Sequence, residues 1–247
     1  MLVFIIFGLY NCLLMPNEFN LLFVLEVIMY STKCLTILNK STFHGLDVIT
    51  KYDLCSEYLN GIRHVLNKAM DEYTRVAILR FDLHLPKGVD CPDYPLEYDS
   101  SVITRFIESF KAQLQADRAK KKREGKRYYR CTVRYVWAKE ISQSVNPHYH
   151  VALVLNRDAY FGFGRYGELN DNLAGKIYRA WASALALSPD SSMSLIHIPE
   201  NPVYSLDKNS QDYPEQCNTV FHRLSYLAKF ETKHYGNKGK NFATSRL

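Results

Sequence analysis

The sequence predicts an α+β domain built around a central, mainly antiparallel sheet with flanking helices. Three observations indicate this class. Stretches with helical spacing of apolar residues alternate with β-rich runs, two of these runs flank a hairpin-like segment, and neither a repeat nor a linker divides the 247 residues. With 47% hydrophobic and 23% charged residues, the chain has the ordinary balance of a globular domain that buries a substantial core.

The first half of the chain predicts two helices with a strand between them. Apolar residues recur at helical spacing over residues 54–70, and residues 75–85 then form a β-rich run that Pro86 ends. A second helix is expected to begin at a cap in residues 99–100 and to stop near Gly125.

The second half predicts a hairpin and two more helices. The expected elements are hairpin strands at 128–140 and 148–155, a helix over 173–181, a strand over 194–198, a loop over 199–214 and a final helix over 220–228. Residues 40–240 are therefore expected to form one domain, with residues 1–30 as an apolar N-terminal extension and residues 241–247 as a basic tail.

Residues 1–29 are strongly apolar, yet they fit neither a signal peptide nor a spanning helix. No Lys or Arg precedes Lys33, and residues such as Pro16 and Glu18 interrupt the apolar run. Three interpretations remain: a membrane-associated segment, a buried hairpin, or an upstream extension of a reading frame whose native start is Met29 or later. The last is favoured, and no stable membrane association is expected.

The six cysteines show no C-x-x-C pair and no disulfide-like spacing. This usage is typical of a reduced, cytoplasmic protein without structural zinc.

A candidate metal site lies in the predicted hairpin. His148 and His150 are two residues apart on a strand, so their imidazoles share one face, and the hairpin can fold Glu140 back beside them. Two nitrogens and a carboxylate oxygen suit a divalent cation with open positions. The alternative is a surface hairpin whose histidines are incidental. The opposite face of the strand is expected to be buried through Val151, Leu153 and Leu155.

A basic run follows the second helix. The chain carries a formal charge of +6 and a pI near 8.9, which favours a polyanionic partner. Within the run, Tyr128 and Tyr129 accompany the cations, a combination that suits single-stranded nucleic acid. The alternative is a solvated helix end. The candidate DNA-binding residues are Lys120, Lys121, Lys122, Arg123, Lys126, Arg127 and Arg130.

Together these motifs resemble a known family. An acid, a short gap, His-hydrophobic-His on a strand and a later Tyr-x-x-Lys, here Tyr226 to Lys229, form the pattern of HUH-type rolling-circle replication initiators. More closely, residues 80–86, 148–160 and 225–229 look like the inovirus-type replication proteins, which include the YagK/YfjJ C-terminal domain of enteric prophages.

The resemblance implies an HUH endonuclease-like fold and a metal-dependent DNA nicking endonuclease that starts rolling-circle replication of a filamentous phage or prophage. Tyr226 would attack a phosphodiester of single-stranded origin DNA held by Mg²⁺ or Mn²⁺ on Glu140, His148 and His150. Lys229 would assist. The products would be a 5′-phosphotyrosyl link and a free 3′-OH for a host polymerase and helicase.

Tyr235 is the runner-up nucleophile, and without the resemblance Tyr226 would be one of 18 tyrosines packed on an amphipathic helix. Tyr226 has no second tyrosine in a Tyr-x-x-x-Tyr arrangement, which favours the single-tyrosine class, and no phosphate loop supports a built-in helicase.

Two other functions are compatible with the same residues. One is a non-cleaving nucleic-acid-binding regulator of a prophage, and the other is a metal-dependent hydrolase that uses activated water. Asp82 and His84 share a face of the preceding strand, where a core histidine or a strand-edge carboxylate is the simpler interpretation of either residue.

Overall fold

The computed structural model describes residues 35–86, 101–142, 145–231, 233 and 240–246. From Thr36 onward, these described residues belong to one compact unit. The predicted N-terminal extension and the runner-up Tyr235 lie outside the described residues.

A six-stranded sheet forms the centre of this unit, and all of its pairings are antiparallel. Its order is β10-β6-β7-β5-β8, and β9 pairs with β5 on the same side as β8. The strands are β5 (Arg75–His84), β6 (Arg134–Ser142), β7 (Val145–Asn156), β8 (Ile196–His197), β9 (Val203–Asp207) and β10 (Phe242–Thr244). The predicted α+β class with a mainly antiparallel sheet is thus confirmed.

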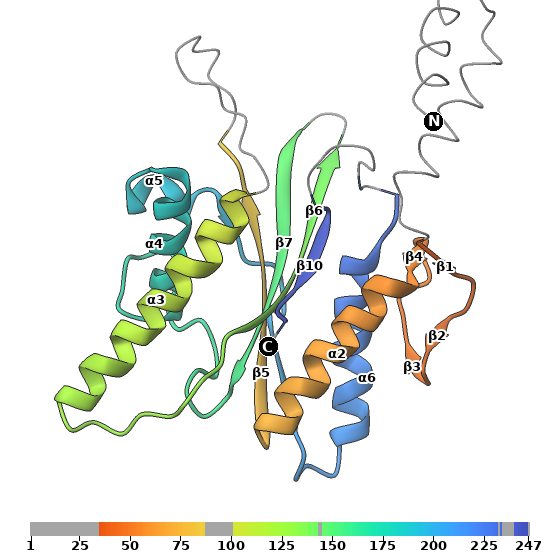
Figure 1. Ribbon diagram of the computed structural model, residues 1–247, viewed down its shortest axis with the longest axis horizontal. Coiled ribbons are helices and arrows are strands. Elements are labelled where there is room, and N and C mark those ends of the chain that lie inside the picture. The colour runs from red at the N-terminus through yellow and green to blue at the C-terminus, as the bar shows by residue number, and fades with distance from the viewer. Residues whose placement is uncertain (1–34, 87–100, 143–144, 232, 234–239, 247) are drawn as a thin grey trace, which may run out of the picture. The chain divides into compact units, whose positions relative to one another are not determined.

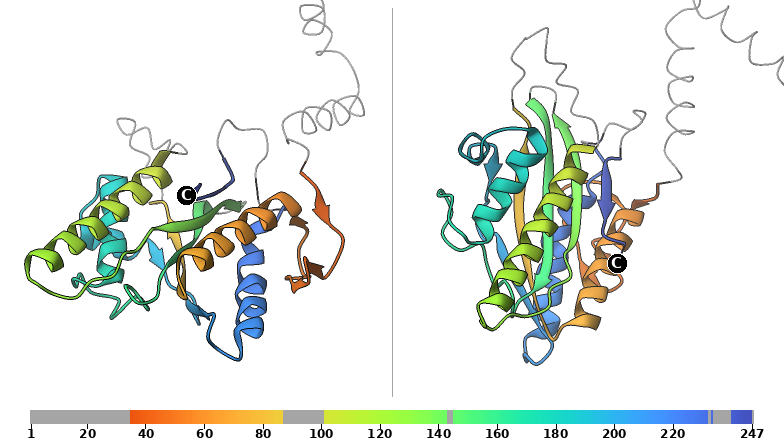
Figure 2. Two further views of the ribbon diagram at one scale, coloured as in Figure 1. Left: turned by 60° about the horizontal axis from the view of Figure 1, so that its bottom comes forward. Right: turned by 60° about the vertical axis from the view of Figure 1, so that its left-hand side comes forward.

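Helices cover both faces of the sheet (Figures 1 and 2). α3 (Ser101–Arg123) and α4 (Leu173–Leu185) lie on one face, with the short α5 (Pro189–Met193) beside α4. α2 (Ser56–Glu72) and α6 (Tyr213–Ser225) lie on the other, and a 3-10 turn, η1 (Tyr226–Ala228), continues α6. Two small strand pairs precede or border α2: β1 (Ile37–Leu38) with β4 (Leu54–Cys55), and β2 (Thr42–Phe43) with β3 (Leu46–Asp47).

Strand alternation separates the interior into two cores. Leu79 and Phe81 of β5 pack with Phe106 of α3 and Trp181 of α4 on one face. On the other face, Ile78 packs with apolar residues of α2 and α6. Because successive side chains of a strand point to opposite faces, one sheet serves both cores. Within the described part of the chain, none of the helices has the length and apolar character needed to cross a membrane.

Several predicted elements are confirmed. β5, α4 and the end of α3 lie where the sequence placed them, and Gly125, two residues beyond α3, has a φ of 64° that glycine adopts without strain. The hairpin is present too, although its first strand begins at Arg134 rather than at residue 128.

The prediction of a loop over residues 199–214 is wrong. This segment contains β9, which pairs with residues 75–79 of β5, and the first turn of α6. β9 is only five residues long and mostly half-buried, so its alternation was too weak to recognise. Similarly, residues 242–244 of the expected basic tail form β10, which pairs with residues 136–138 of β6.

Candidate functional site

Glu140, His148 and His150 converge at the hairpin of β6 and β7. Glu140 is the register partner of His148, and His150 follows two residues later on the same face. One ligand atom from each residue lies within 4.8 Å of the other two. His150 Nε2 is 3.2 Å from His148 Nε2 and 3.3 Å from Glu140 Oε2. The structure therefore brings together the three residues that the sequence predicted as a metal site.

Asp82 orients one of these histidines. Its Oδ1 lies 2.6 Å from His150 Nδ1, and a carboxylate that carries no proton can only accept, so Nδ1 carries the proton of that bond. The Nε2 atom of His150 then faces Glu140 and His148. A carboxylate behind a histidine in this way is the usual support of a metal-binding imidazole. Arg80 is buried and donates from Nη1 to the same Asp82 oxygen at 2.6 Å, which fixes the carboxylate in turn.

Burial and neighbouring charge keep two of the candidate ligands, His148 and Glu140, in the protonation states that bind metal. Burial, together with the charge of His150, lowers the pKa of His148 to about 4, so its imidazole is neutral at pH 7. Burial alone would raise the pKa of Glu140, but His150 and Lys229 lower it to about 2. Glu140 Oε1 is buried and has no hydrogen-bond partner among the described residues. An unpartnered buried carboxylate oxygen beside two imidazoles fits a divalent cation.

Lys229 links the candidate metal ligands to Tyr226. Its ammonium donates to Glu140 Oε2 at 3.0 Å and to the Tyr226 hydroxyl at 3.3 Å. The ring of Tyr226 also meets the ring of His150 edge-on, with centroids 5.2 Å apart. The phenol predicted as a nucleophile is thus next to the predicted metal ligands.

The electrostatics around the phenol act in opposite directions. Burial raises the pKa of Tyr226, and the negative charge of Glu140 raises it further, whereas Lys229 lowers it. Tyr226 therefore holds its proton at rest, and formation of the phenolate depends on nearby cations. The pKa of Lys229 is raised because Glu140 and Tyr226 outweigh the effect of burial, so it is a cation at neutral pH.

Sequence reasoning did not assign a role to several residues around this centre. Tyr52 packs edge-on against Tyr226, and the Lys229 ammonium lies 4.8 Å from the centroid of the Tyr52 ring. Buried Lys233 donates to the Lys229 carbonyl, and burial lowers its pKa to about 8. For Asp82, alternation predicts only a shared face with His84, and the pairing of β5 with β7 is what places it beside His150.

The structure does not bring the predicted basic run to this centre. Arg130 lies at the far end of β7, where its carbonyl accepts from the Asn156 side chain. His148 and Asn156 are eight residues apart on that strand, which corresponds to about 26 Å at a strand rise of roughly 3.3 Å per residue. Moreover, α3, whose last turn begins the run, covers the face of the sheet opposite the histidines.

Comparison with known proteins gives a consistent family. Residues 38–245 match the model of the YagK/YfjJ C-terminal domain. The chain is 41% identical to "Uncharacterized protein YagK" of Escherichia coli (strain K12) over 83% of this chain and 96% of that protein. It is 33% identical to "Uncharacterized protein YfjJ" of the same strain over 77% of this chain and 94% of that protein. No solved structure matches the chain. The family match spans the sheet, the candidate ligands and Tyr226, and with both relatives it shows that the chain belongs to the YagK/YfjJ C-terminal domain family.

Proposed function

We propose that this protein is a metal-dependent, single-strand DNA endonuclease of the HUH type that nicks through Tyr226. In this proposal it starts rolling-circle replication of a filamentous phage or prophage and leaves a 5′-phosphotyrosyl intermediate. A single observation carries the proposal: Lys229 donates to Glu140 and to Tyr226 at once, so a candidate nucleophile and a candidate metal site share one cation.

The site fits a divalent ion such as Mg²⁺ or Mn²⁺. Glu140, His148 and His150 would hold it, and Asp82 would orient His150. When bound, the ion supplies Lewis-acid polarisation of a phosphate oxygen.

The chain's own residues account for the remaining chemistry. Tyr226 gives up its phenolic proton to solvent, and Lys229 stabilises the phenolate through the contact that it already makes. The Tyr226 oxygen forms a bond to phosphorus, the bond from phosphorus to the 3′-oxygen breaks, and that oxygen takes up a proton. The released 3′-OH is the end from which a host polymerase would extend.

Covalent trapping tests this proposal. Full-length protein is incubated with labelled single-stranded origin DNA in Mg²⁺, in Mn²⁺ and in EDTA. The wild type should form a covalent adduct only with metal. Tyr226→Phe should reduce the adduct to background, a loss of at least about 10³-fold, because only the attacking oxygen is removed. Lys229→Ala should slow the reaction by about 10- to 100-fold, since a neighbouring cation assists the attack but does not perform it.

Tyr235→Phe is the matched control and should keep the adduct. An adduct that persists in Tyr226→Phe and disappears in Tyr235→Phe would transfer the role to Tyr235. If the wild type forms no adduct with any metal but still binds DNA, the non-cleaving regulator is the better description. If it cleaves without an adduct, the nucleophile is water.

A further inference from the structure

A second polar region lies on the outer half of α3, away from the candidate metal centre. Three neighbouring hollows, with volumes of about 400, 280 and 350 Å³, open between this part of α3 and the segments around residues 127–133 and 158–164. Tyr160 lines all three of them. We call the two that lie toward residues 127–133 the α3 groove. The residues of this groove that matter below are Arg118, Lys121, Arg127, Tyr128, Tyr129 and Tyr160.

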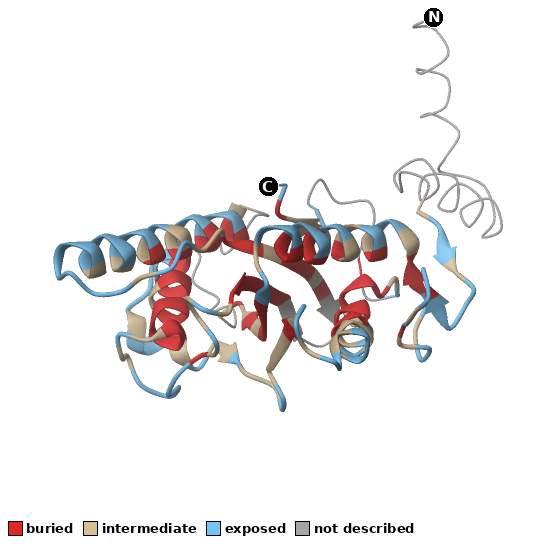
Figure 3. Cartoon of the chain, turned by 90° about the horizontal axis from the view of Figure 1, so that it is seen from below, coloured by how far each residue is buried: buried red, intermediate tan, exposed pale blue. Residues whose placement is uncertain are grey.

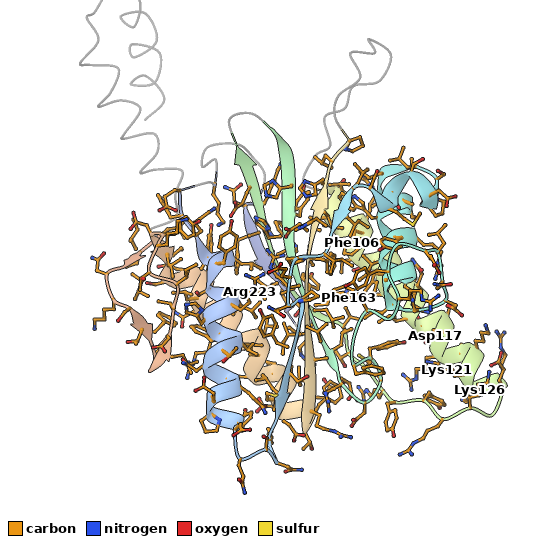
Figure 4. All side chains as sticks on the ribbon, turned by 180° about the vertical axis from the view of Figure 1, so that it is seen from behind. Phe106, Asp117, Lys121, Lys126, Phe163 and Arg223 are labelled. Carbon is orange, nitrogen blue, oxygen red and sulfur yellow. The ribbon has the colours of Figure 1, made fainter. Side chains whose placement is uncertain are left out.

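Cations and tyrosine rings alternate along this groove. Arg118 lies 5.4 Å from the centroid of the Tyr128 ring, and Arg127 lies 4.8 Å from that of Tyr129. Lys121 lies 5.6 Å from the centroid of the Tyr160 ring. Figure 4 shows Asp117 and Lys121 on the outer half of α3 and Lys126 just beyond its end, and Figure 3 shows that this end of the helix is largely exposed.

The acids of the groove are already engaged. Asp117 accepts from the Tyr160 hydroxyl at 2.9 Å and pairs with Lys121 at 2.9 Å. Asp158 pairs with Arg75. Arg118 and Arg127, by contrast, have no carboxylate within ion-pair distance in the part of the chain that the structure describes. Two exposed guanidiniums therefore remain available for an external anion, each beside a tyrosine ring.

We propose that the α3 groove binds single-stranded nucleic acid, with Arg118 and Arg127 on phosphates and Tyr129 against a base. Guanidiniums supply the phosphate contacts, and an aromatic ring that is 38% exposed, as Tyr129 is, offers a stacking surface to any base. An acidic peptide would use the cations but would leave the rings without a role.

The placement of the groove makes it a separate site. It lies on the α3 side of the sheet. Its lining residue Val133 directly precedes Arg134, which pairs with Val154, and Val154 is about 20 Å along β7 from His148 at a rise of roughly 3.3 Å per residue. The groove thus extends the proposed function by a second contact with the same class of substrate. The two proposals can be tested separately, since cleavage needs a metal and binding to the groove does not.

The test is binding in EDTA, measured by fluorescence anisotropy with the full-length protein. The probes are labelled 20-nucleotide oligo-dT, oligo-rU of the same length, and a DNA duplex of equal length. Arg118→Ser with Arg127→Ser is compared with Lys122→Ser with Arg123→Ser. Both pairs remove two positive charges from adjoining parts of the chain. Lys122 and Arg123 belong to the basic run predicted to bind DNA but do not line the hollows, so the comparison separates the groove from the run as a whole.

The groove pair should weaken oligo-dT binding by about 10-fold and make the salt dependence shallower by about 1.4 in log–log slope, as two lost phosphate contacts require. The control pair should change affinity less than about twofold, because non-contacting charges act only through screened attraction. Tyr129→Ser keeps every charge and should weaken binding about fivefold at unchanged slope. The affinity for oligo-rU shows whether RNA binds as tightly as DNA.

Three results would overturn the inference. Equal losses of oligo-dT affinity in the two double variants would show that net charge, and not the groove, determines binding. Tighter binding of the duplex than of either single strand would assign another substrate. Loss of binding in His148→Ala with His150→Ala would place the nucleic acid at the metal centre. A failure of nicking with oligonucleotide binding intact would contradict the proposed endonuclease activity but not the α3 groove.

Discussion

The two faces of the central sheet are built from the same strands but differ in chemistry. Along β5 from Val76 onward, the side chains that face α3 and α4 are all apolar, whereas those on the other face change from apolar to polar halfway along the strand. The first set is Ala77, Leu79, Phe81 and Leu83, and the second is Val76, Ile78, Arg80, Asp82 and His84. On this same face, β7 changes from apolar to polar side chains at His150 and His148, and β6 does so at Glu140.

This difference shows how the candidate centre is held. Its ligands lie on strands whose opposite face packs against the core formed with α3 and α4, so the spacing of the ligands follows from sheet geometry rather than from loops. Sites carried by strands of a packed scaffold are positioned more accurately than sites on loops. The α3 groove is the opposite case: its cations are exposed and act through many weak contacts.

The sharpest test of this comparison uses neighbouring residues of one strand. His148→Ala with His150→Ala should abolish Mn²⁺ binding in calorimetry, because two of the three ligands are gone. Leu153→Ala, on the reverse face of β7, should reduce the free energy of unfolding by about 2–5 kcal/mol and leave Mn²⁺ affinity unchanged. Unchanged Mn²⁺ affinity in the histidine double variant would contradict the site.

A smaller loss of metal affinity is expected when Asp82, which contacts His150 from behind, is replaced. Asp82→Asn should weaken Mn²⁺ binding by about 10- to 100-fold, since the amide holds His150 less firmly than the carboxylate does. His197→Gln is the control: His197 Nδ1 is 3.4 Å from the other oxygen of Asp82, but its side chain is 62% exposed. Its replacement should leave the affinity within about twofold. Equal effects of the two substitutions would show that Asp82 does not act through His150.

The last comparison concerns pH and metal-free stability. The pKa of His148 is about 4 in the folded chain, below its ordinary value of 6.5, so the unfolded chain takes up a proton first as the pH falls. The contribution of His148 to stability is therefore complete above about pH 6.5 and is lost as the pH approaches 4. Urea unfolding at pH 7, 5.5 and 4.5 should show a shallower decline for His148→Gln than for the wild type. Parallel curves for the two proteins would show that His148 titrates normally.

Much of the histidine face could be predicted from the sequence because it depends on local rules. Strand alternation places His148 with His150, and a short hairpin brings Glu140 opposite them. The spacing of Tyr226 and Lys229 similarly places both on one side of a helical turn.

What the sequence did not predict depends on long-range pairing. Asp82 reaches His150 only because β5 pairs with β7 in a register that sets them opposite each other, and no local pattern specifies that register. β9 and β10 were missed for a related reason, since short strands are stabilised by the strand they join more than by their own sequence. The distance between the basic run and the metal ligands likewise follows from the path of α3 across the other face.

One feature of the backbone bears on how this family can vary. The Tyr226-to-Lys229 turn is held at both ends. At its start, η1 continues directly from α6. At its end, the backbone of Lys229 forms an antiparallel β-bridge with Leu54, and the Phe230 amide donates to the Asp53 carbonyl at 2.8 Å. An inserted or deleted residue within this turn would either break the bridge or separate the phenol from the ammonium. The centre should therefore tolerate exchanges of neighbouring side chains far better than any change in the length of this turn.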